Sequence, residues 1–403
     1  MAIPRRHEGI EGMKDASILE TMPIRVRWLA VAAVIAVTLA ACGQDVSPPS
    51  EGDGSDRSPE ESPTPEPLVN PDDIISGGPP PDGIPPIDDP QFVTARDLRF
   101  LDDQEPVLAV EVNGEAKAYP LQIMTWHEIV NDEVGGVPVT VTYCPLCNTG
   151  IAFERPTIDG ELLDFGTSGK LYNSNLVMYD RETETYWMQA TGQAIVGQLT
   201  GEQLTFVPAR ILSFGDWRAE HPDALVLSRD TGHDRPYGEN PYAGYDSTDQ
   251  PFLFTGEPDP RLPATARVLG IARAGDVVAF PYEAVREDAV NGSAVVMERV
   301  DGEPVAVFWK AGTASALDSM EIAEGRDVGA IAAYRPEADG RVLSFEAREN
   351  GIVDVETGSV WSILGRAVSG PLAGEQLVPE LGIDSLWFDW AAFHPDTRIF
   401  GQG

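Results

Sequence analysis

The sequence predicts a mainly β fold with a few short helices, duplicated internally into two similar β-rich lobes. The first observation behind this prediction is a series of short stretches rich in aromatic and β-branched residues, separated by turn residues, such as "NLVMYD" and "TYWMQA". The second observation is that segments of the first half of the chain recur, in the same order, in the second half.

The internal repeat is visible in four pairs of segments. The sequence "VLAVEVNGEAKAYPLQI" matches "VLGIARAGDVVAFPYEA", and "GVPVTVTYC" matches "GEPVAVFWK". Further on, "YDRETETYW" matches "VDVETGSVW", and "FGDWRAEHPD" matches "WFDWAAFHPD". We therefore expect a first repeat over residues 91–250 and a second, degenerate repeat over residues 251–403.

Turn residues place the individual elements. Asn113-Gly114, within the alternating stretch 107–120, is typical of a type I′ hairpin turn, and Gly135-Gly136 predicts a second hairpin. A short helix is expected over 214–220, ending before Pro222, because a residue that precedes proline avoids the α region. Another helix is expected with Pro120 as its first residue.

The N-terminus resembles a bacterial lipoprotein signal. Arg25 and Arg27 precede an uncharged apolar run, "WLAVAAVIAVTLAA", which suits a signal-peptide core and ends in "LAAC" at Cys42. We expect a signal peptide over 1–41, with Met22 as an alternative start, and lipidation of Cys42. The protein is then held by this lipid on the extracytoplasmic face of the cell membrane.

Composition restricts the partners. Residues 42–90 are rich in Pro, Ser, Asp and Glu without apolar periodicity, which predicts a disordered linker. The chain has 65 acidic and 28 basic residues, a formal net charge of −37. Such a surface repels phosphate backbones, so nucleic-acid binding is not expected, and membrane attachment depends on the lipid.

Lipidation of Cys42 leaves two of the three cysteines, Cys144 and Cys147, in the segment "VTVTYCPLCNTG". This spacing suits a redox dithiol, a metal site, or a structural disulfide, which would close only a small loop. Export places the pair where disulfides persist. The spacing alone leaves all three alternatives open.

The two repeats serve as a control for one another, because a residue found in only one copy is a candidate for chemistry. Cys144 aligns with Lys310 and Cys147 with Thr313, so the second repeat has lost both thiols. A two-residue turn at Gly135-Gly136 would place His127 opposite Cys144, where an imidazole can acidify the thiol or share a metal with it.

The same control adds further candidate residues. The metal alternative uses Cys144, Cys147 and His127, with His233 as a candidate fourth ligand, and its ligands suit copper or zinc. His233 lies in a connecting loop, 231–248, that is either a lid over the site or a plain connection. Five polar residues without a counterpart in the second repeat are candidates to line the cleft: Lys170, Tyr172, Asn173, Ser174 and Asn175.

Several long motifs together resemble the bacterial family DUF3179: "WHEIVND", "VTYCPLCNTG", "LYNSNLVMYDRET", "YWMQATGQAIVG" and "FHPDT". The resemblance implies an exported, often lipid-anchored protein with a cysteine motif like that at 144–147, and it implies no activity. It also implies that relatives can carry another residue at the second cysteine position, which would favour a single-thiol or metal role.

These observations lead to three functional hypotheses. The first is thiol–disulfide redox chemistry, with Cys144 as the attacking thiolate, His127 as its activator and Cys147 as the resolving thiol. The second is copper or zinc binding. The third is a non-catalytic binding module that a disulfide braces. The sequence specifies neither a small-molecule substrate nor a protein partner.

Overall fold

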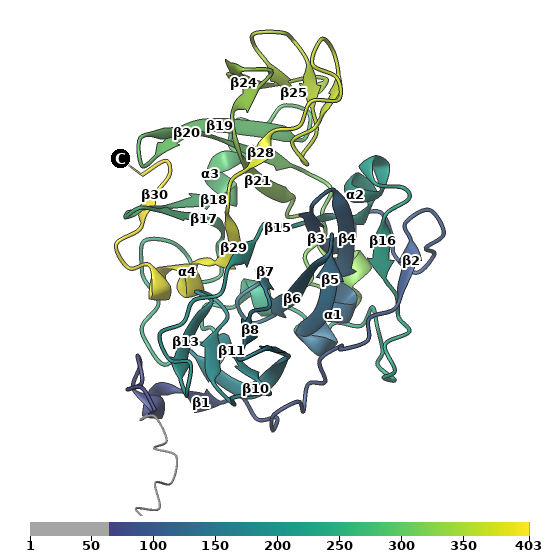
Figure 1. Cartoon of the computed structure of the whole chain (residues 1–403). Helices are drawn as coiled ribbons and strands as arrows, with labels where there is room; N and C mark the ends of the chain where they lie inside the picture. The colour runs from purple at the N-terminus through teal and green to yellow at the C-terminus, as the bar shows by residue number, and fades with distance from the viewer. Residues whose placement is uncertain (1–63, 403) are drawn as a thin grey trace, which may run out of the picture. The chain divides into compact units, whose positions relative to one another are not determined.

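The computed structural model describes residues 64–402 (Figure 1). Short β-strands predominate, and the four α-helices of this range are at most seven residues long, so the mainly β prediction is confirmed. Within the same range, no helix is long and apolar enough to cross a membrane. The predicted signal peptide, Cys42 and the linker up to residue 63 lie outside the described residues.

The first repeat, together with β1 from the segment before it, forms three main sheets, with strand orders β15-β3-β4-β16-β2, β14-β7-β6-β5 and β1-β10-β11-β12-β13, and a small hairpin, β8-β9. Its elements are β1 (Ile75–Ser76), β2 (Phe92–Thr94), β3 (Pro106–Val112), β4 (Glu115–Pro120), α1 (Leu121–His127), β5 (Ile129–Val134), β6 (Val137–Cys144), β7 (Thr149–Glu154), β8 (Thr157–Ile158), β9 (Glu161–Leu162), β10 (Phe165–Tyr172), β11 (Asn175–Asp180), β12 (Tyr186–Met188), β13 (Gln193–Val196), β14 (Phe206–Val207), β15 (Ala209–Ser213), α2 (Phe214–Glu220) and β16 (Leu225–Leu227).

The second repeat builds counterparts of these sheets in the same order, without strands equivalent to β1 and β2: β29-β17-β18-β30, β28-β21-β20-β19 and β24-β25-β26-β27, with the hairpin β22-β23. Its elements are β17 (Arg267–Arg273), β18 (Asp276–Pro281), α3 (Tyr282–Val285), β19 (Ser293–Val300), β20 (Glu303–Lys310), β21 (Ala330–Arg335), β22 (Glu337–Ala338), β23 (Arg341–Val342), β24 (Phe345–Arg348), β25 (Gly351–Asp354), β26 (Val360–Trp361), β27 (Ala367–Ser369), β28 (Val378–Pro379), β29 (Ile383–Leu386), α4 (Trp387–Phe393) and β30 (Arg398–Ile399). Three 3₁₀ turns complete the list: η1 (Pro71–Asp73), η2 (Tyr245–Ser247) and η3 (Ile322–Glu324).

The two repeats share their interior. One buried apolar cluster contains Val107 and Trp217 of the first repeat together with Phe308, Tyr334 and Trp361 of the second. Strand β15 packs against β21 of the second repeat, and β29 packs against β7 of the first (Figure 1). Two separate lobes are therefore not confirmed, because each repeat covers apolar surface of the other.

Both predicted hairpins form with the expected turns. Asn113 and Gly114 have φ of 50° and 82°, and Gly135 and Gly136 have φ of 59° and 77°, as type I′ turns require. In the second hairpin Ile129 pairs with Thr142 and Val134 with Val137, which is the register expected from a two-residue turn.

One of the two predicted helices has the expected bounds, and the other begins one residue later than expected. Helix α2 spans Phe214–Glu220 and ends at His221, whose backbone N–H donates to the carbonyl of Trp217, as expected. Helix α1 begins at Leu121, and Pro120 is its N-cap in an extended conformation, so the expectation that Pro120 is the first helical residue was wrong by one position.

The predicted linker over 42–90 is wrong for residues 64–90. Strand β1 pairs with β10, and the backbone N–H of Ile87 donates to Ile129 at 2.9 Å while its carbonyl accepts from Asn131 at 2.9 Å. Ile87 is only 2% exposed. Isolated apolar residues and backbone hydrogen bonds attach this segment to the first repeat. Such an attachment needs no periodic apolar pattern, so the sequence of the segment does not show that it is ordered.

A duplicated polar motif stabilises each repeat. The buried carboxylate of Asp180 accepts from the indole N–H of Trp187 at 2.8 Å and from the backbone N–H of Thr183 at 2.6 Å. Asp354 accepts from Trp361 at 3.0 Å and from the backbone of Thr357 at 2.6 Å. The recurrence of this motif identifies it as part of the fold.

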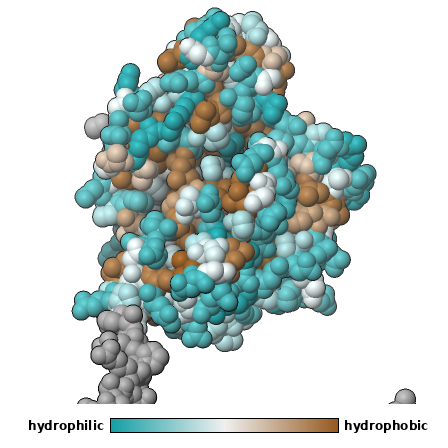
Figure 2. Space-filling model, viewed as in Figure 1, coloured by the Kyte–Doolittle hydropathy of each residue, from teal (hydrophilic) through white to brown (hydrophobic). Residues whose placement is uncertain are grey.

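The surface agrees with the composition. Figure 2 shows hydrophilic residues over most of the face in view, with hydrophobic residues in smaller patches between them. A net charge of −37 keeps such a surface well hydrated.

Removing either aspartate of the duplicated motif should destabilise the protein to a similar degree. Asp180→Ala and Asp354→Ala each leave a buried indole N–H and a backbone N–H without an acceptor, which should cost about 2–5 kcal/mol in total. Urea denaturation followed by circular dichroism measures this cost. Asp288→Ala, at an exposed position, is the control, and a loss below about 0.5 kcal/mol in either test variant would contradict the assignment.

Candidate functional site

The two cysteines form a buried pair at the end of β6. Cys144 is the last residue of that strand, and the turn before β7 brings Cys147 back beside it. The sulfur atoms are 3.1 Å apart, and both thiols are free. Cys144 is 2% exposed and Cys147 is fully buried.

A tight turn between β10 and β11 directs a carbonyl oxygen at the pair. Asn173 and Ser174 have φ of 51° and 67°, which is the geometry of a type I′ turn. The carbonyl oxygen of Ser174 accepts from the Cys147 thiol at 3.4 Å and lies 3.9 Å from the Cys144 sulfur. The main-chain carbonyl of Ser174 therefore lies beside both thiols, in a contact that does not use the serine side chain.

The second repeat contributes a carboxyl group to this site. Asp389 lies on α4, is 2% exposed, and accepts hydrogen bonds from Asn175 and Ser385, each at 2.9 Å. The backbone N–H of Leu386, just before α4, donates to the carbonyl of Cys147 at 2.8 Å. These contacts fix the start of α4 against the cysteine turn.

The buried environment raises the pKa of both Cys147 and Asp389. Burial, the hydrogen bond with Cys144 and the negative charge of Asp389 raise the pKa of Cys147 well above its usual value. Burial also raises the pKa of Asp389 to about 6, although hydrogen bonds from Asn175, Ser385 and Cys147 limit the rise. Asp389 thus titrates close to neutral pH, next to a thiol that holds its proton tightly.

The connection between the repeats covers the thiols. Tyr242, Tyr245, Leu253 and Phe254 pack against the apolar cluster that contains both cysteines. The Ser174 hydroxyl donates to the carbonyl of Phe252 at 2.5 Å, which attaches this segment to the cysteine site. Of the two interpretations of the connecting loop, a cover over the site agrees with these contacts.

The equivalent position in the other half of the molecule holds an ion pair. Lys310 aligns with Cys144 and Asp216 aligns with Asp389, and the ammonium group of Lys310 pairs with the Asp216 carboxylate. Each repeat therefore presents a helix aspartate to the β6-type strand of the other. At the strand of the second repeat, Lys310 neutralises Asp216. At the strand end of the first repeat, Asp389 faces a thiol instead.

His127 does not contact the cysteines, contrary to the prediction. It lies in α1 rather than in the strand ladder, so its side chain does not follow the register of β5 and β6. Nδ1 is 2.6 Å from the carbonyl oxygen of Pro85, and Nε2 is 2.6 Å from the Tyr237 hydroxyl. Burial lowers the pKa of His127 to about 4, so the ring is neutral and attaches the connecting segment to the first repeat.

The predicted metal ligands are not brought together. His233 is exposed, and its ring is tilted against the His127 ring with the centroids 5.4 Å apart, so its described contact is with His127 and not with the thiols. Among residues 64–402, no group of three or more histidine, cysteine, aspartate or glutamate side chains could hold a metal ion.

The remaining cleft candidates divide into two groups. Asn175 reaches the site through its hydrogen bond to Asp389, and Asn173 forms the turn that presents Ser174. Lys170 lies over the Tyr186 ring at 5.9 Å, and Tyr172 packs near Phe393, so neither side chain has a described contact with the thiols.

Sequence reasoning missed two carboxyl groups. Asp389 was hidden because its counterpart, Asp216, is also an aspartate, and residues present in both repeats were interpreted as structural. Glu128 is buried at a φ of 60°, and burial raises its pKa to about 8. It lies near Tyr242, whose own pKa is raised by burial and by the charges of Glu128 and Cys144.

Fold and site together define a class of protein: an internally duplicated β protein in which one repeat holds a buried dithiol and the other supplies a buried acid to it. The chain belongs to the family described as protein of unknown function (DUF3179), whose model matches residues 81–397. No curated protein and no solved structure matches it.

The raised pKa of Asp389 makes stability depend on pH. The folded state holds this proton more tightly than the unfolded state, so protonation of Asp389 adds to the free energy of unfolding at low pH. This stabilisation is lost as pH rises from about 4 to about 6, a change of about 3 kcal/mol. Asp389→Asn should flatten this part of the stability curve in urea titrations. The pKa of Asp354 is lowered in the folded state, so its carboxylate stabilises the fold more as pH rises. Asp354→Asn should therefore remove a pH dependence of opposite sign to that of Asp389. An unchanged curve for Asp389→Asn would contradict the assignment.

Proposed function

We propose that the protein is a thiol–disulfide oxidoreductase, with Cys144 and Cys147 as its redox pair. The observation that carries the proposal is the 3.1 Å separation of two free sulfur atoms beside a carboxyl group that titrates near neutral pH. A shift of about 1 Å would bring these sulfurs to the length of a disulfide bond.

The two thiols have different roles. A thiolate is the nucleophile in disulfide exchange, and the pKa of Cys147 is raised far above neutral pH. Attack on a substrate disulfide is therefore assigned to Cys144. Cys147, which is fully buried, is the resolving thiol.

Asp389 supports the proposed resolving step as a proton acceptor. Its pKa of about 6 leaves it mostly ionised at neutral pH, yet close enough to neutrality to return the proton later. This role replaces the activation by His127 that the sequence predicted, because the nitrogens of His127 are engaged by Pro85 and Tyr237.

The proposed reaction balances without a further cofactor. The Cys144 thiolate attacks one sulfur of a substrate disulfide, forms a mixed disulfide and releases the first substrate thiolate. Cys147 then gives its proton to Asp389 and attacks the Cys144 sulfur, which releases the second substrate thiolate. Two electrons pass from the protein dithiol to the substrate disulfide. Cys144 releases its proton to water before the attack, Cys147 releases its proton to Asp389, and the two substrate thiolates take up two protons in return.

Substrate access requires movement of the cover. Tyr242 and Tyr245 pack over the cysteine cluster, and the bond from Ser174 to Phe252 holds the segment in place. The stretch of Tyr242 and Tyr245 is held more firmly, because the backbone N–H groups of Gly244 and Tyr245 donate to the carbonyls of Asp318 and Leu317. We therefore assign the opening to the stretch around Phe252, where breaking the side-chain bond from Ser174 costs far less than unfolding the sheets beneath it.

Export and lipid anchoring through Cys42 remain part of the proposal. They depend on the apolar run and the "LAAC" motif, which lie outside the described residues. An extracytoplasmic location supplies disulfide substrates, which the proposed chemistry needs.

Serine substitutions test the two thiol roles. In glutathione buffers the native protein should lose two hydrogens on oxidation, detected by intact mass, whereas Cys144→Ser and Cys147→Ser should not. Cys147→Ser should accumulate a mixed disulfide at Cys144, because the resolving thiol is gone. His127→Ala should lower the melting temperature without changing the redox transition. A dithiol that never oxidises, together with a melting temperature lowered by the serine variants, would support a purely structural role instead.

Asp389→Asn tests the proton transfer. Replacement by the neutral amide should slow disulfide closure from the mixed disulfide by about 10²-fold at neutral pH and remove the inflection near pH 6. Stopped-flow mixing with oxidised glutathione measures the rate. The matched control is Asp216→Asn, at the equivalent position of the other half, which should leave the rate unchanged. Equal rates for native protein and Asp389→Asn would exclude the assigned role.

A further inference from the structure

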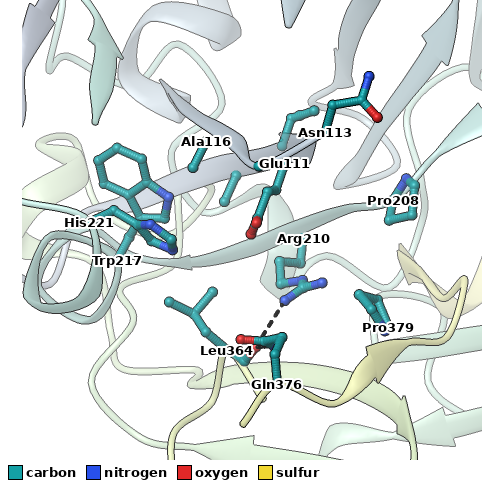
Figure 3. A pocket seen from close by; sticks show the side chains of 13 residues that line it. Glu111, Asn113, Ala116, Pro208, Arg210, Trp217, His221, Leu364, Gln376 and Pro379 are labelled. Carbon is teal, nitrogen blue, oxygen red and sulfur yellow. Dashed lines mark hydrogen bonds between the residues drawn. The ribbon is translucent and has the colours of Figure 1, made fainter. Parts of the chain in front are cut away.

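A cavity of about 280 Å³ lies between the two repeats, apart from the thiols (Figure 3). Strands β3 and β15 and helix α2 form one side of it. Leu364, Gln376 and Pro379 of the second repeat form the other side. Its volume lies just below the range of pockets that hold drug-sized molecules, so it suits a smaller ligand.

Two opposite charges face this cavity without pairing. Arg210 and Glu111 point into it from neighbouring strands (Figure 3), yet they form no ion pair with each other. One terminal nitrogen of Arg210 donates to the Tyr334 hydroxyl at 3.1 Å and to the Leu364 carbonyl at 3.4 Å. The rest of its guanidinium fork has no carboxylate partner among residues 64–402.

An arginine without a carboxylate partner is unexpected in a chain with a net charge of −37. The guanidinium fork matches a carboxylate in two parallel hydrogen bonds, so Arg210 is suited to hold an anionic group of a ligand. Glu111 is exposed and has no partner of opposite charge in the described residues, so it is suited to hold a cationic group.

Apart from Asn113 and Gln376, the rest of the cavity lining is aromatic or apolar. Trp217 and His221 lie at one end of it, with ring centroids 5.6 Å apart (Figure 3). Burial lowers the pKa of His221, so its ring is neutral at neutral pH. Together the two rings offer a surface for an apolar ligand body.

The duplication supplies a comparison within the same molecule. A second cavity, of about 180 Å³, occupies the equivalent place in the other half, where Trp390 and His394 repeat the aromatic end. There Ala272 stands in place of Glu111 and Ile383 in place of Arg210. The aromatic pair thus belongs to the fold, whereas the two charges belong to one cavity alone.

We propose that the cavity between Glu111 and Arg210 binds a small zwitterion with an apolar body, of the class of a free apolar amino acid. The carboxylate of the ligand lies on Arg210, its ammonium group on Glu111, and its side chain against Trp217 and His221. This site is independent of the dithiol and of the redox chemistry proposed for it.

Calorimetric titration with three related probes tests this site. L-phenylalanine carries both charges, 3-phenylpropionate lacks the ammonium group, and phenethylamine lacks the carboxylate. We expect phenylalanine to bind the purified protein at least about tenfold more tightly than either analogue, because only it engages both side chains. L-leucine, titrated in parallel, should bind in the same way.

Variants assign the binding to the two charges. Arg210→Gln and Glu111→Gln should each weaken phenylalanine binding by about tenfold or more, whereas Arg286→Gln, at an exposed ion pair elsewhere, should not. Glu111 is exposed, so Glu111→Gln keeps the test valid even where Arg210→Gln disturbs packing at Tyr334. The proposal is overturned by absence of binding of both amino acids at millimolar concentration, by equal binding of an analogue, or by binding that Glu111→Gln leaves unchanged.

Discussion

The contact between α4 and the cysteine turn is the interaction on which the site depends. The backbone N–H of Leu386 holds the carbonyl of Cys147, and Asp389, three residues later, faces the thiol. Both come from the second repeat, so the first repeat by itself would hold a dithiol without its acid. The same packing buries the sulfurs and raises the pKa of Asp389 and of Cys147. The burial of the thiols, the raised pKa values of Cys147 and Asp389, and the attachment of one repeat to the other therefore all result from one interface.

The two halves show how one framework holds different chemistry. At the aspartate of each helix, the partner is a lysine in one half and a thiol in the other. Of the two equivalent cavities, one is lined by Glu111 and Arg210, and the other has Ala272 and Ile383 at the same positions. The duplicated Asp–Trp hydrogen bonds are unchanged between the halves, because they close turns that both copies need. Differences between the halves therefore mark chemistry, and identities mark the fold, with Asp389 as an instructive exception.

Local sequence signals predicted the local structure well. The glycine turn at 135–136 fixed the register of β5 and β6, because only a two-residue turn with positive φ fits there. The same signal failed for His127, since register governs strands and His127 lies in a helix. Asp389 could not be found in this way, because it approaches the thiols from more than two hundred residues away. Only the packing of one repeat on the other creates that proximity, and no periodic pattern encodes it.

The exchange of helix aspartates between the halves also bears on how such a chain arises. Each half gives its helix to the strand ends of the other, which is the reciprocal arrangement found across the two-fold axis of a homodimer. Gene fusion of a symmetric dimer yields such a chain directly. Once both subunits share one polypeptide, the two formerly identical centres can mutate separately. One centre is then free to exchange its cysteine for Lys310 and become a permanent internal brace, while its twin keeps both thiols.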